Sequence, residues 1–147
     1  MFRGISQISV DVKGRVAIPA RHRDALREPA EGQVVLTVDP DGCLLLYALP
    51  EWERIERALM SKPNMNPRVR KLQRLFVGHA TEVELDGQGR LLLPPPLREY
   101  AGIDRRVALI GQGNKFEIWD EDRWNDRRAE WLAAEGDWDD ALDALSL

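Results

Sequence analysis

The sequence is poor in the two residue types that build disulfides and most metal sites. It has one cysteine, Cys43, and two histidines, His22 and His79, among 147 residues. A lone cysteine excludes an internal disulfide and suits a reducing cytoplasm. The three residues show no short ligand spacing, so we expect neither a metal nor a cofactor. The opening segment MFRGISQISV also lacks a long apolar run, and no signal peptide or membrane span is expected.

Motifs of catalysis are missing as well. A nucleophile pair of Cys43 and His79 is conceivable, but Cys43 lies in the apolar stretch GCLLLY, which is typical of a buried strand. The glycine-rich stretches GQGRLLLP and GQGNKF lack the Gly-Lys-Ser/Thr ending of a phosphate-binding P-loop. We therefore expect that the protein is not an enzyme.

The chain as a whole carries no excess of positive charge, because its net charge is −4. The two halves differ, however: residues 1–75 contain 13 Lys and Arg against 9 Asp and Glu, whereas residues 76–147 contain 8 against 16. A basic half on an acidic body is able to orient a molecule on a polyanion. A solvated surface of mixed charge is equally compatible with these counts.

One nine-residue pattern occurs twice. Residues 11–19 read DVKGRVAIP, and residues 86–94, seventy-five positions later, read DGQGRLLLP. The matched residues are Asp11, Gly14, Arg15 and Pro19 in the first copy and Asp86, Gly89, Arg90 and Pro94 in the second. A further match between LLLYALPEW, residues 44–52, and FEIWDEDRW, residues 116–124, extends the duplication over most of the chain.

Each copy predicts the same series of elements. An alternating strand (ISQISVD or TEVELD) leads into a glycine turn, and a short buried strand (RVAI or RLLL) follows. Proline then opens a short helix, and two more strands complete the copy. Apolar spacing predicts helices in PEWERIERALM and PRVRKLQRLF between the copies. It also predicts one or two helices at the C-terminus, where Trp138, Leu142 and Leu145 form an apolar stripe.

The fold class expected from these elements is mainly β with flanking helices. Two interleaved copies would form a pseudo-two-fold β-barrel, and full closure of the barrel would remove the exposed sheet edges. We divide the chain into a first module at residues 1–54, linking helices at 55–75, a second module at 76–125 and an acidic helical tail at 126–147.

Five motifs together resemble the MraZ family. They are MFRGISQISVDVKGRVAIPARHR, LLLYALPEWE, RLFVGHA, DGQGRLLLPPPLREYAG and GQGNKFEIWD. The resemblance implies two AbrB-like modules of the swapped-hairpin, double-psi type, each marked by an Asp-x-x-x-Arg signature. It further implies a ring-shaped, octamer-like homo-oligomer in the cytoplasm, on the nucleoid and without membrane attachment. Such a ring binds direct repeats of double-stranded DNA in its own promoter and represses the division and cell-wall operon.

The residues of the repeated turn suggest distinct roles. We expect each aspartate to accept hydrogen bonds from turn amides or to orient the arginine four positions later. An arginine so placed still reaches a phosphate or a guanine edge. The structural motif is therefore Asp11, Gly14, Pro19, Asp86, Gly89 and Pro94. The candidate DNA-binding residues are Arg3, Lys13, Arg15, Arg21, Arg23 and Arg90.

The two copies differ in charge. Lys13 of the first copy corresponds to Gln88 of the second, and Arg21 corresponds to Pro96. We therefore assign the DNA-binding face chiefly to the first copy. For Arg21 and Arg23, the exposed face of a short helix is an alternative explanation.

Two other functions remain open at this point. An antitoxin-like barrel acts through a protein partner, but such proteins usually join one barrel copy to a disordered tail, whereas this tail is short and patterned. A scaffold ring without DNA binding is the other alternative. A gel shift against the region upstream of the gene separates this scaffold ring from a repressor.

Overall fold

The computed structural model describes residues 1–134 and 136–146. Glu135 and Leu147, both in the expected C-terminal tail, lie outside the described residues. The strands are β1 (Phe2–Ser9), β2 (Arg15–Ala17), β3 (Gln33–Val38), β4 (Leu44–Ala48), β5 (Thr81–Glu84), β6 (Arg90–Leu92), β7 (Arg106–Gly113) and β8 (Phe116–Asp120). The helices are α1 (Ala20–Arg27), a short 3-10 helix (Glu28–Ala30), α2 (Leu49–Met60), α3 (Pro67–Phe76), α4 (Pro95–Tyr100), α5 (Glu121–Ala133) and α6 (Asp137–Leu145).

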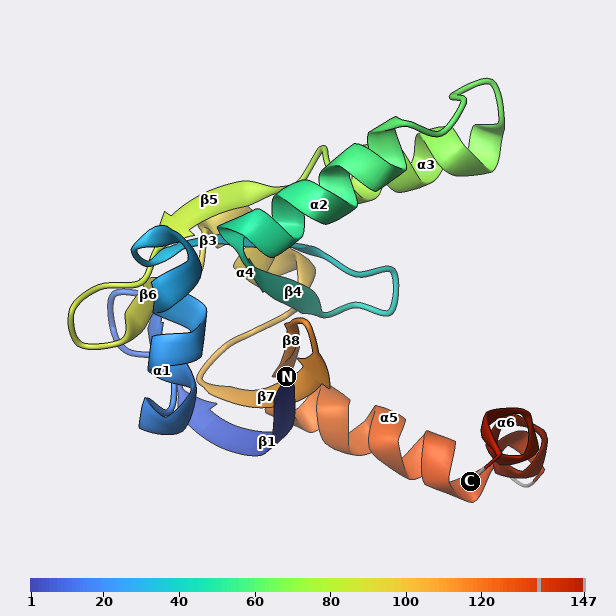
Figure 1. The fold of residues 1–147 in the computed structure, drawn as a ribbon. Helices are drawn as coiled ribbons and strands as arrows, with labels where there is room; N and C mark the ends of the chain where they lie inside the picture. The colour runs from blue at the N-terminus through green and yellow to red at the C-terminus, as the bar shows by residue number, and fades with distance from the viewer. Residues whose placement is uncertain (135, 147) are drawn as a thin grey trace.

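The two sequence copies exchange strands within one antiparallel sheet (Figure 1). The strand order is β1-β7-β8-β4-β3-β5, which reads the same from both ends when the copies are interchanged. Strand β1 of the first copy pairs with β7 of the second, and β5 of the second copy pairs with β3 of the first. Neither copy therefore completes a sheet alone.

A pseudo-two-fold axis passes between the copies at two places. In the large sheet, the central residue pair of β4 and β8 is Leu45 opposite Glu117. In a separate two-stranded sheet, the central pair of β2 and β6 is Val16 opposite Leu91. A mainly β fold with flanking helices, built by tandem duplication around a pseudo-two-fold axis, is thus confirmed.

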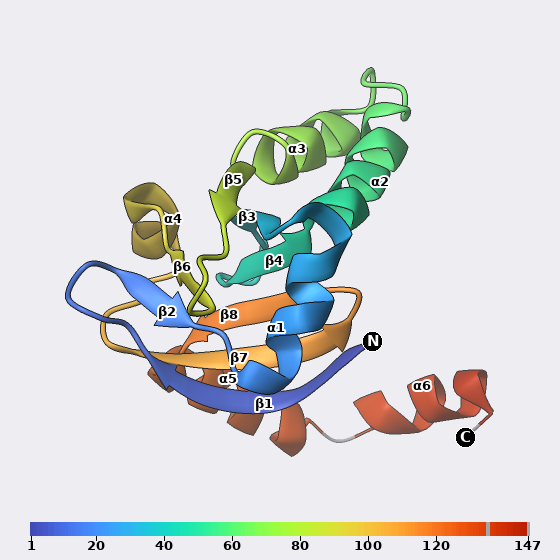
Figure 2. The ribbon, with the colours of Figure 1, turned by 60° about the vertical axis from the view of Figure 1, so that its left-hand side comes forward.

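The expectation of full barrel closure is wrong. The six-stranded sheet ends at β1 and β5, and it does not return on itself. The reason lies in the turns, where the chain reverses after Val10 and after Leu85. The strands that follow have three residues each, and they pair with one another across the pseudo-two-fold axis. Figure 2 shows this short pair lying apart from the large sheet.

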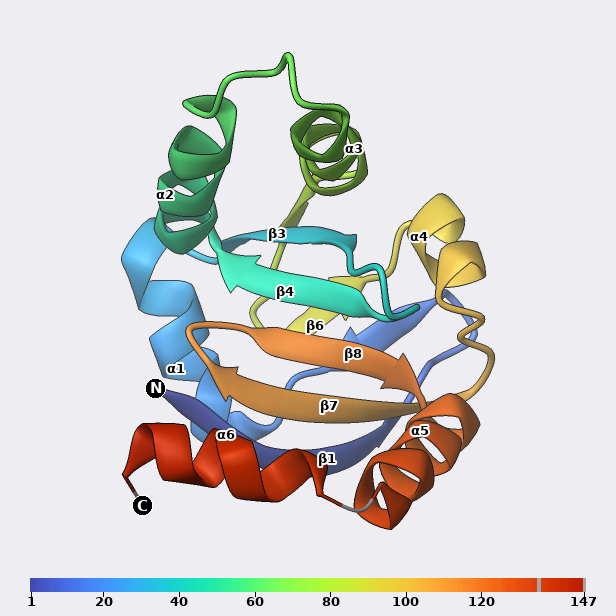
Figure 3. The same ribbon diagram turned by 90° about the vertical axis from the view of Figure 1, so that its right-hand side faces the viewer.

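Each face of the large sheet carries a hydrophobic cluster. The inner cluster joins sheet residues such as Leu36 and Leu109 to Val16 and Leu91 of the two-stranded sheet. Helices α1 and α4 complete it through Leu26 and Leu97. The outer cluster consists of Val35, Cys43, Leu45, Tyr47, Trp52, Ala108 and Trp119. Helices α2 and α3 on one side and α5 on the other flank this outer face and pack against it (Figure 3). Central strands buried on both sides explain why Gln33–Val38 and Leu44–Ala48 read as almost continuous apolar runs.

Within the described residues, no helix combines the length and apolar character needed to cross a membrane.

Candidate nucleic-acid interface

Each repeated turn is organised by its aspartate. Oδ1 of Asp11 accepts hydrogen bonds from the backbone N–H groups of Lys13 and Arg15, both at 2.9 Å. Oδ2 of Asp11 accepts a third from Nε of Arg15 at 2.8 Å. The carboxylate therefore closes the turn through the backbone and fixes the arginine side chain at the same time.

The second turn repeats this geometry. Oδ1 of Asp86 accepts from the N–H groups of Gln88 and Arg90, and Oδ2 accepts from Nε of Arg90, all at 2.9 Å. The pKa of Asp86, like that of Asp11, is lowered, chiefly by the backbone hydrogen bond from the arginine of its own turn. Both carboxylates are therefore held in the ionised form that accepts these bonds.

Glycine is required at the last position of each turn. Gly14 has φ +84° and Gly89 has φ +75°, a left-handed conformation that other residues adopt at a cost. Two matching hydrogen bonds then tie each turn to the other copy. Ile18 N–H donates to the carbonyl of Gly89 at 2.8 Å, and Leu93 N–H donates to the carbonyl of Gly14 at 3.0 Å.

The strands that leave these turns form a narrow ribbon, which we define as β2 and β6. Arg15 lies opposite Leu92, and Ala17 lies opposite Arg90. The central pair between them is buried, so alternation places these four side chains on the solvent face. Arg15 and Arg90 occupy diagonal positions, which typically lie roughly 7–8 Å apart.

The two ribbon arginines keep donors available for a ligand. Their side chains are 26% and 32% exposed, and each uses Nε for its own aspartate. In residues 1–134 and 136–146, no acceptor is bonded to Nη1 or Nη2 of Arg15 or Arg90. In each guanidinium, the bond from Nε to the aspartate sets the orientation, and the two Nη groups are left to donate to a ligand.

Other cations surround the ribbon unequally. Lys13 is exposed at the tip of the first turn, where the second turn has Gln88. Arg23 donates from Nε to the carbonyl of Ile18 at 2.7 Å, so its position is fixed by the backbone beside the ribbon. The exposed-helix explanation therefore does not describe Arg23, which is half-buried.

Arg3 and Arg21 lie away from the ribbon. Arg3 is opposite Gln112, near the start of β1, whereas the first turn follows the other end of that strand. Arg21 is exposed on α1 and donates from Nη2 to Oγ of Ser6 at 2.8 Å. The structure thus groups Lys13, Arg15, Arg23 and Arg90 around the two turns and leaves the other two candidates along β1.

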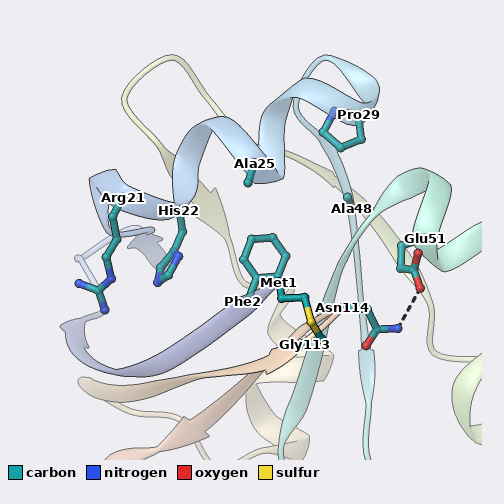
Figure 4. Close-up of a pocket in the computed structure, with 10 residues that line it drawn as sticks. All are labelled: Met1, Phe2, Arg21, His22, Ala25, Pro29, Ala48, Glu51, Gly113 and Asn114. Carbon is teal, nitrogen blue, oxygen red and sulfur yellow. Dashed lines mark hydrogen bonds between the residues drawn. The ribbon is translucent and has the colours of Figure 1, made fainter.

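A hollow opens beside Arg21, at the start of β1 (Figure 4). Its wall contains Phe2 and His22, and the ring of His22 also lies 5.0 Å from that of Phe116, centroid to centroid. Burial lowers the pKa of His22, and repulsion from Arg21 lowers it further. The imidazole is therefore a neutral packing group.

Residues outside the predicted set also support the turns. Nη2 of Arg27 donates to the carbonyl of Asp86 at 2.6 Å. Arg98 donates to the carbonyls of Ile103 and Asp104 at 3.0 and 2.6 Å, and its Nη1 lies close to Gly14. The match of Arg98 to Arg23 in the repeat was a signal for its role. Arg27 has no such counterpart, because position 102 is glycine.

Within the described residues, no hydrogen bond joins Cys43 to His79, the two groups considered for catalysis. Cys43 is fully buried, and burial raises the pKa of its thiol. Nδ1 of His79 lies 2.8 Å from the carbonyl of Leu75. Among the described residues, no cluster of three or more His, Cys, Asp or Glu side chains is arranged to hold a metal ion.

Strand exchange between two copies, with a repeated Asp-x-x-x-Arg turn at each ribbon end, defines a tandem-duplicated protein of the AbrB-like β class. Comparison with protein-family models gives a match to the family described as "MraZ protein, putative antitoxin-like", over residues 1–75 and again over 76–142. The chain belongs to the MraZ family.

Curated relatives match most or all of the chain. A protein named transcriptional regulator MraZ from Thioalkalivibrio sulfidiphilus is 63% identical, with 100% of both chains covered. The protein of the same name from Halorhodospira halophila is 54% identical, also over 100% of both chains. A third, from Methylococcus capsulatus, is 60% identical over 90% of this chain and 87% of its own.

Proposed function

We propose that this chain is a transcriptional regulator that binds double-stranded DNA through the ribbon of β2 and β6. The observation that carries the proposal is the pair of arginines on the solvent face of the ribbon. Arg15 and Arg90 are both oriented by an aspartate, and both have free Nη groups. The names of the relatives, all transcriptional regulators, support the same function.

The width of the ribbon suits the major groove. Two strands lie about 5 Å apart, and the major groove of B-DNA, about 12 Å wide, admits a two-stranded β-ribbon. Arginine donates through paired N–H groups to O6 and N7 of guanine, the commonest specific contact in that groove. Asp11 and Asp86 offset much of the positive charge of the two arginines. What Arg15 and Arg90 offer a ligand is therefore mainly N–H donors in a fixed direction, and only a small net charge. That property favours contact with base edges over contact with phosphates.

Phosphate contact then falls chiefly to Lys13. Its ammonium is exposed at the tip of the first turn and has a counterpart, Gln88, that lacks a charge. The first copy thus contributes more to affinity, while the pseudo-two-fold axis lets both copies contact bases. The units at residues 1–54 and 76–125 serve as the two DNA-reading modules, and residues 55–75 and 126–147 serve assembly.

One subunit offers few cations, so single-site binding is weak and sensitive to salt. A ring-shaped homo-oligomer presents the same ribbon several times, and linkage of sites raises avidity by roughly 10²–10⁴. The operator consists of short direct repeats in the promoter of the protein's own division and cell-wall operon, which bound protein represses. Binding to that promoter places the protein on the nucleoid.

A gel shift with DNA from upstream of the protein's own gene, at low and at moderate salt, tests the proposal. We expect Arg15→Ala and Arg90→Ala each to weaken binding by roughly 5- to 150-fold, the range for loss of one bidentate base contact. Light scattering should show the same assembly for both variants. Arg106→Ala is the matched control, because Arg106 is an exposed arginine on β7, outside both the ribbon and the segments that serve assembly.

Unchanged binding in both ribbon variants would contradict the proposed interface. Absence of binding by the wild-type protein at low salt would favour the scaffold ring. Loss of assembly in Arg15→Ala would assign that side chain to structure.

A further inference from the structure

The C-terminal helix α6 is amphipathic, and within the described residues the one side-chain hydrogen bond that joins it to another element runs from Nε1 of Trp138 to the carbonyl of Trp131 on α5, at 3.4 Å. All its side chains from Trp138 onward are exposed, and Trp138, Leu142 and Leu145 are 52%, 42% and 67% exposed. Their spacing places them on one face of the helix. A nine-residue helix is marginal in water by itself. Burial of its apolar stripe against another surface would therefore stabilise the helix.

The same helix is strongly acidic. Asp139, Asp140 and Asp143 adjoin the apolar stripe, and no lysine or arginine follows Arg128 in the sequence. The surface that covers α6 should therefore combine apolar contacts with positive charge.

The hairpin of α2 and α3 has that combination, and we call its outer part, residues 60–78, the basic tip. Five lysines and arginines lie between positions 62 and 74, and no aspartate or glutamate occurs between Glu56 and Glu82. Met60, Met65 and Leu72 are exposed there as well. A hollow between the two helices is lined by Met60, Asn64, Arg70, Gln73, Arg74 and Val77.

The basic tip and α6 of one chain lie on opposite sides of the molecule. Figures 1 and 3 show the hairpin beyond one side of the sheet and α6 beyond the other. Helix α5 is fixed to the sheet, because the rings of Trp124 and Trp131 lie 5.9 and 6.0 Å from that of Trp119. Four Cα-to-Cα steps lead from the last residue of α5 to the first of α6, and they span about 14 Å at most. Helix α6 is therefore held away from the hairpin of its own chain.

We infer that α6 of one subunit docks on the basic tip of a second copy of this chain. The apolar stripe enters the hollow between α2 and α3, and the aspartates face Arg68, Lys71 and Arg74. Two different patches meet in this contact, so the arrangement is heterologous and head-to-tail, and it closes into a ring when the rotation between subunits allows. The inference deepens the proposed function, on whose ring it rests.

The basic tip is a poorer candidate for DNA. In Figure 1 the ribbon strand β6 and helix α3 lie at opposite ends of the molecule. The exposed methionines and Leu72 also gain nothing from a phosphate backbone, whereas an apolar helix buries them. DNA contact by this tip is nevertheless an outcome that the test separates.

The test is a charge exchange, with assembly measured by light scattering in the absence of DNA. We expect Arg68→Glu with Lys71→Glu to reduce the assembly to smaller species, and Trp138→Ala to do the same. Addition of Asp139→Lys with Asp143→Lys to the first pair should restore the original mass. Lys13→Glu, a charge reversal at the ribbon tip, is the control that should leave the mass unchanged.

The outcomes are decisive in both directions. An unchanged mass for the charge-reversed and Trp138 variants, each with an unchanged urea midpoint, overturns the inference. A wild-type monomer also overturns it, but leaves ribbon binding testable through Arg15→Ala. If Arg68→Glu with Lys71→Glu weakens DNA binding while the mass is unchanged, the basic tip contacts DNA and the inference fails.

Discussion

The guanidinium of Arg23 lies in the space that a side chain at Gly89 would occupy, and a Cβ atom there would collide with its Nε. Arg98 lies beside Gly14 in the matching position, although a Cβ at Gly14 would still be 3.3 Å from Nη1. The helix of each copy thus braces the turn of the other copy. The two turns are therefore coupled structurally across the pseudo-two-fold axis.

The first prediction compares the two turn glycines. Gly89→Ala should lower the free energy of unfolding by about 3 kcal/mol, because it combines a positive φ with displacement of Arg23. Gly14→Ala should cost about 1 kcal/mol, because it adds backbone strain with a milder contact. Urea unfolding measures both. Equal losses of stability in the two variants would show that the Arg23 side chain moves aside at little cost. If Arg23 does not move aside, Arg23→Ala should restore part of the stability that Gly89→Ala loses.

The second prediction concerns the turn carboxylates. Each has a lowered pKa in the folded state, so its stabilising effect is present above the ordinary value of 3.8 and is lost as pH falls through the lowered value. Asp11→Asn should therefore lower the urea midpoint at neutral pH, and its difference from wild type should shrink in acid. Asp24→Asn, at an exposed position on α1, is the control. If the urea midpoints of Asp11→Asn and wild type still differ below the lowered pKa, the variant is destabilised by altered hydrogen-bond geometry and not by loss of the carboxylate charge.

The third prediction uses the unequal turn tips. Lys13→Gln makes the first turn resemble the second, and it should reduce the slope of log affinity against log salt by about 0.9 for each subunit bound. Gln88→Lys should increase the slope by a similar amount. Anisotropy titrations at several salt concentrations measure both slopes. If neither substitution changes the slope, the turn tips do not reach phosphates.

The fourth prediction concerns His22. Its pKa is lowered by burial, so the unfolded chain binds more protons once the pH falls below about the ordinary 6.5. The free energy of unfolding should therefore decrease as pH drops through that value and below it. In His22→Gln this part of the pH dependence should disappear, whatever the variant's stability at neutral pH. A wild-type profile that stays parallel to that of the variant would contradict the neutral, buried imidazole.

Much of the site was predictable because its interactions are local. Asp11 and Arg15 are four residues apart, and glycine at position 14 permits the turn that joins them, so nine residues suffice to indicate the geometry. The placement of Arg3 was not predictable in this way. It depends on the length and direction of β1, which carry it to the far end of the strand from the turn.

The sequence by itself determined the duplication, the alternating strands and the chemistry of both turns, because these depend on residues close together along the chain. Only the tertiary structure decided which strand pairs with which. Strand β1 could satisfy its apolar alternation against either copy, and it pairs with β7. Likewise β2 pairs with β6, which brings Arg15 and Arg90 onto one face and leaves the large sheet open. The physical reason is that two similar copies present nearly the same pattern, so the choice between them rests on how the whole core packs.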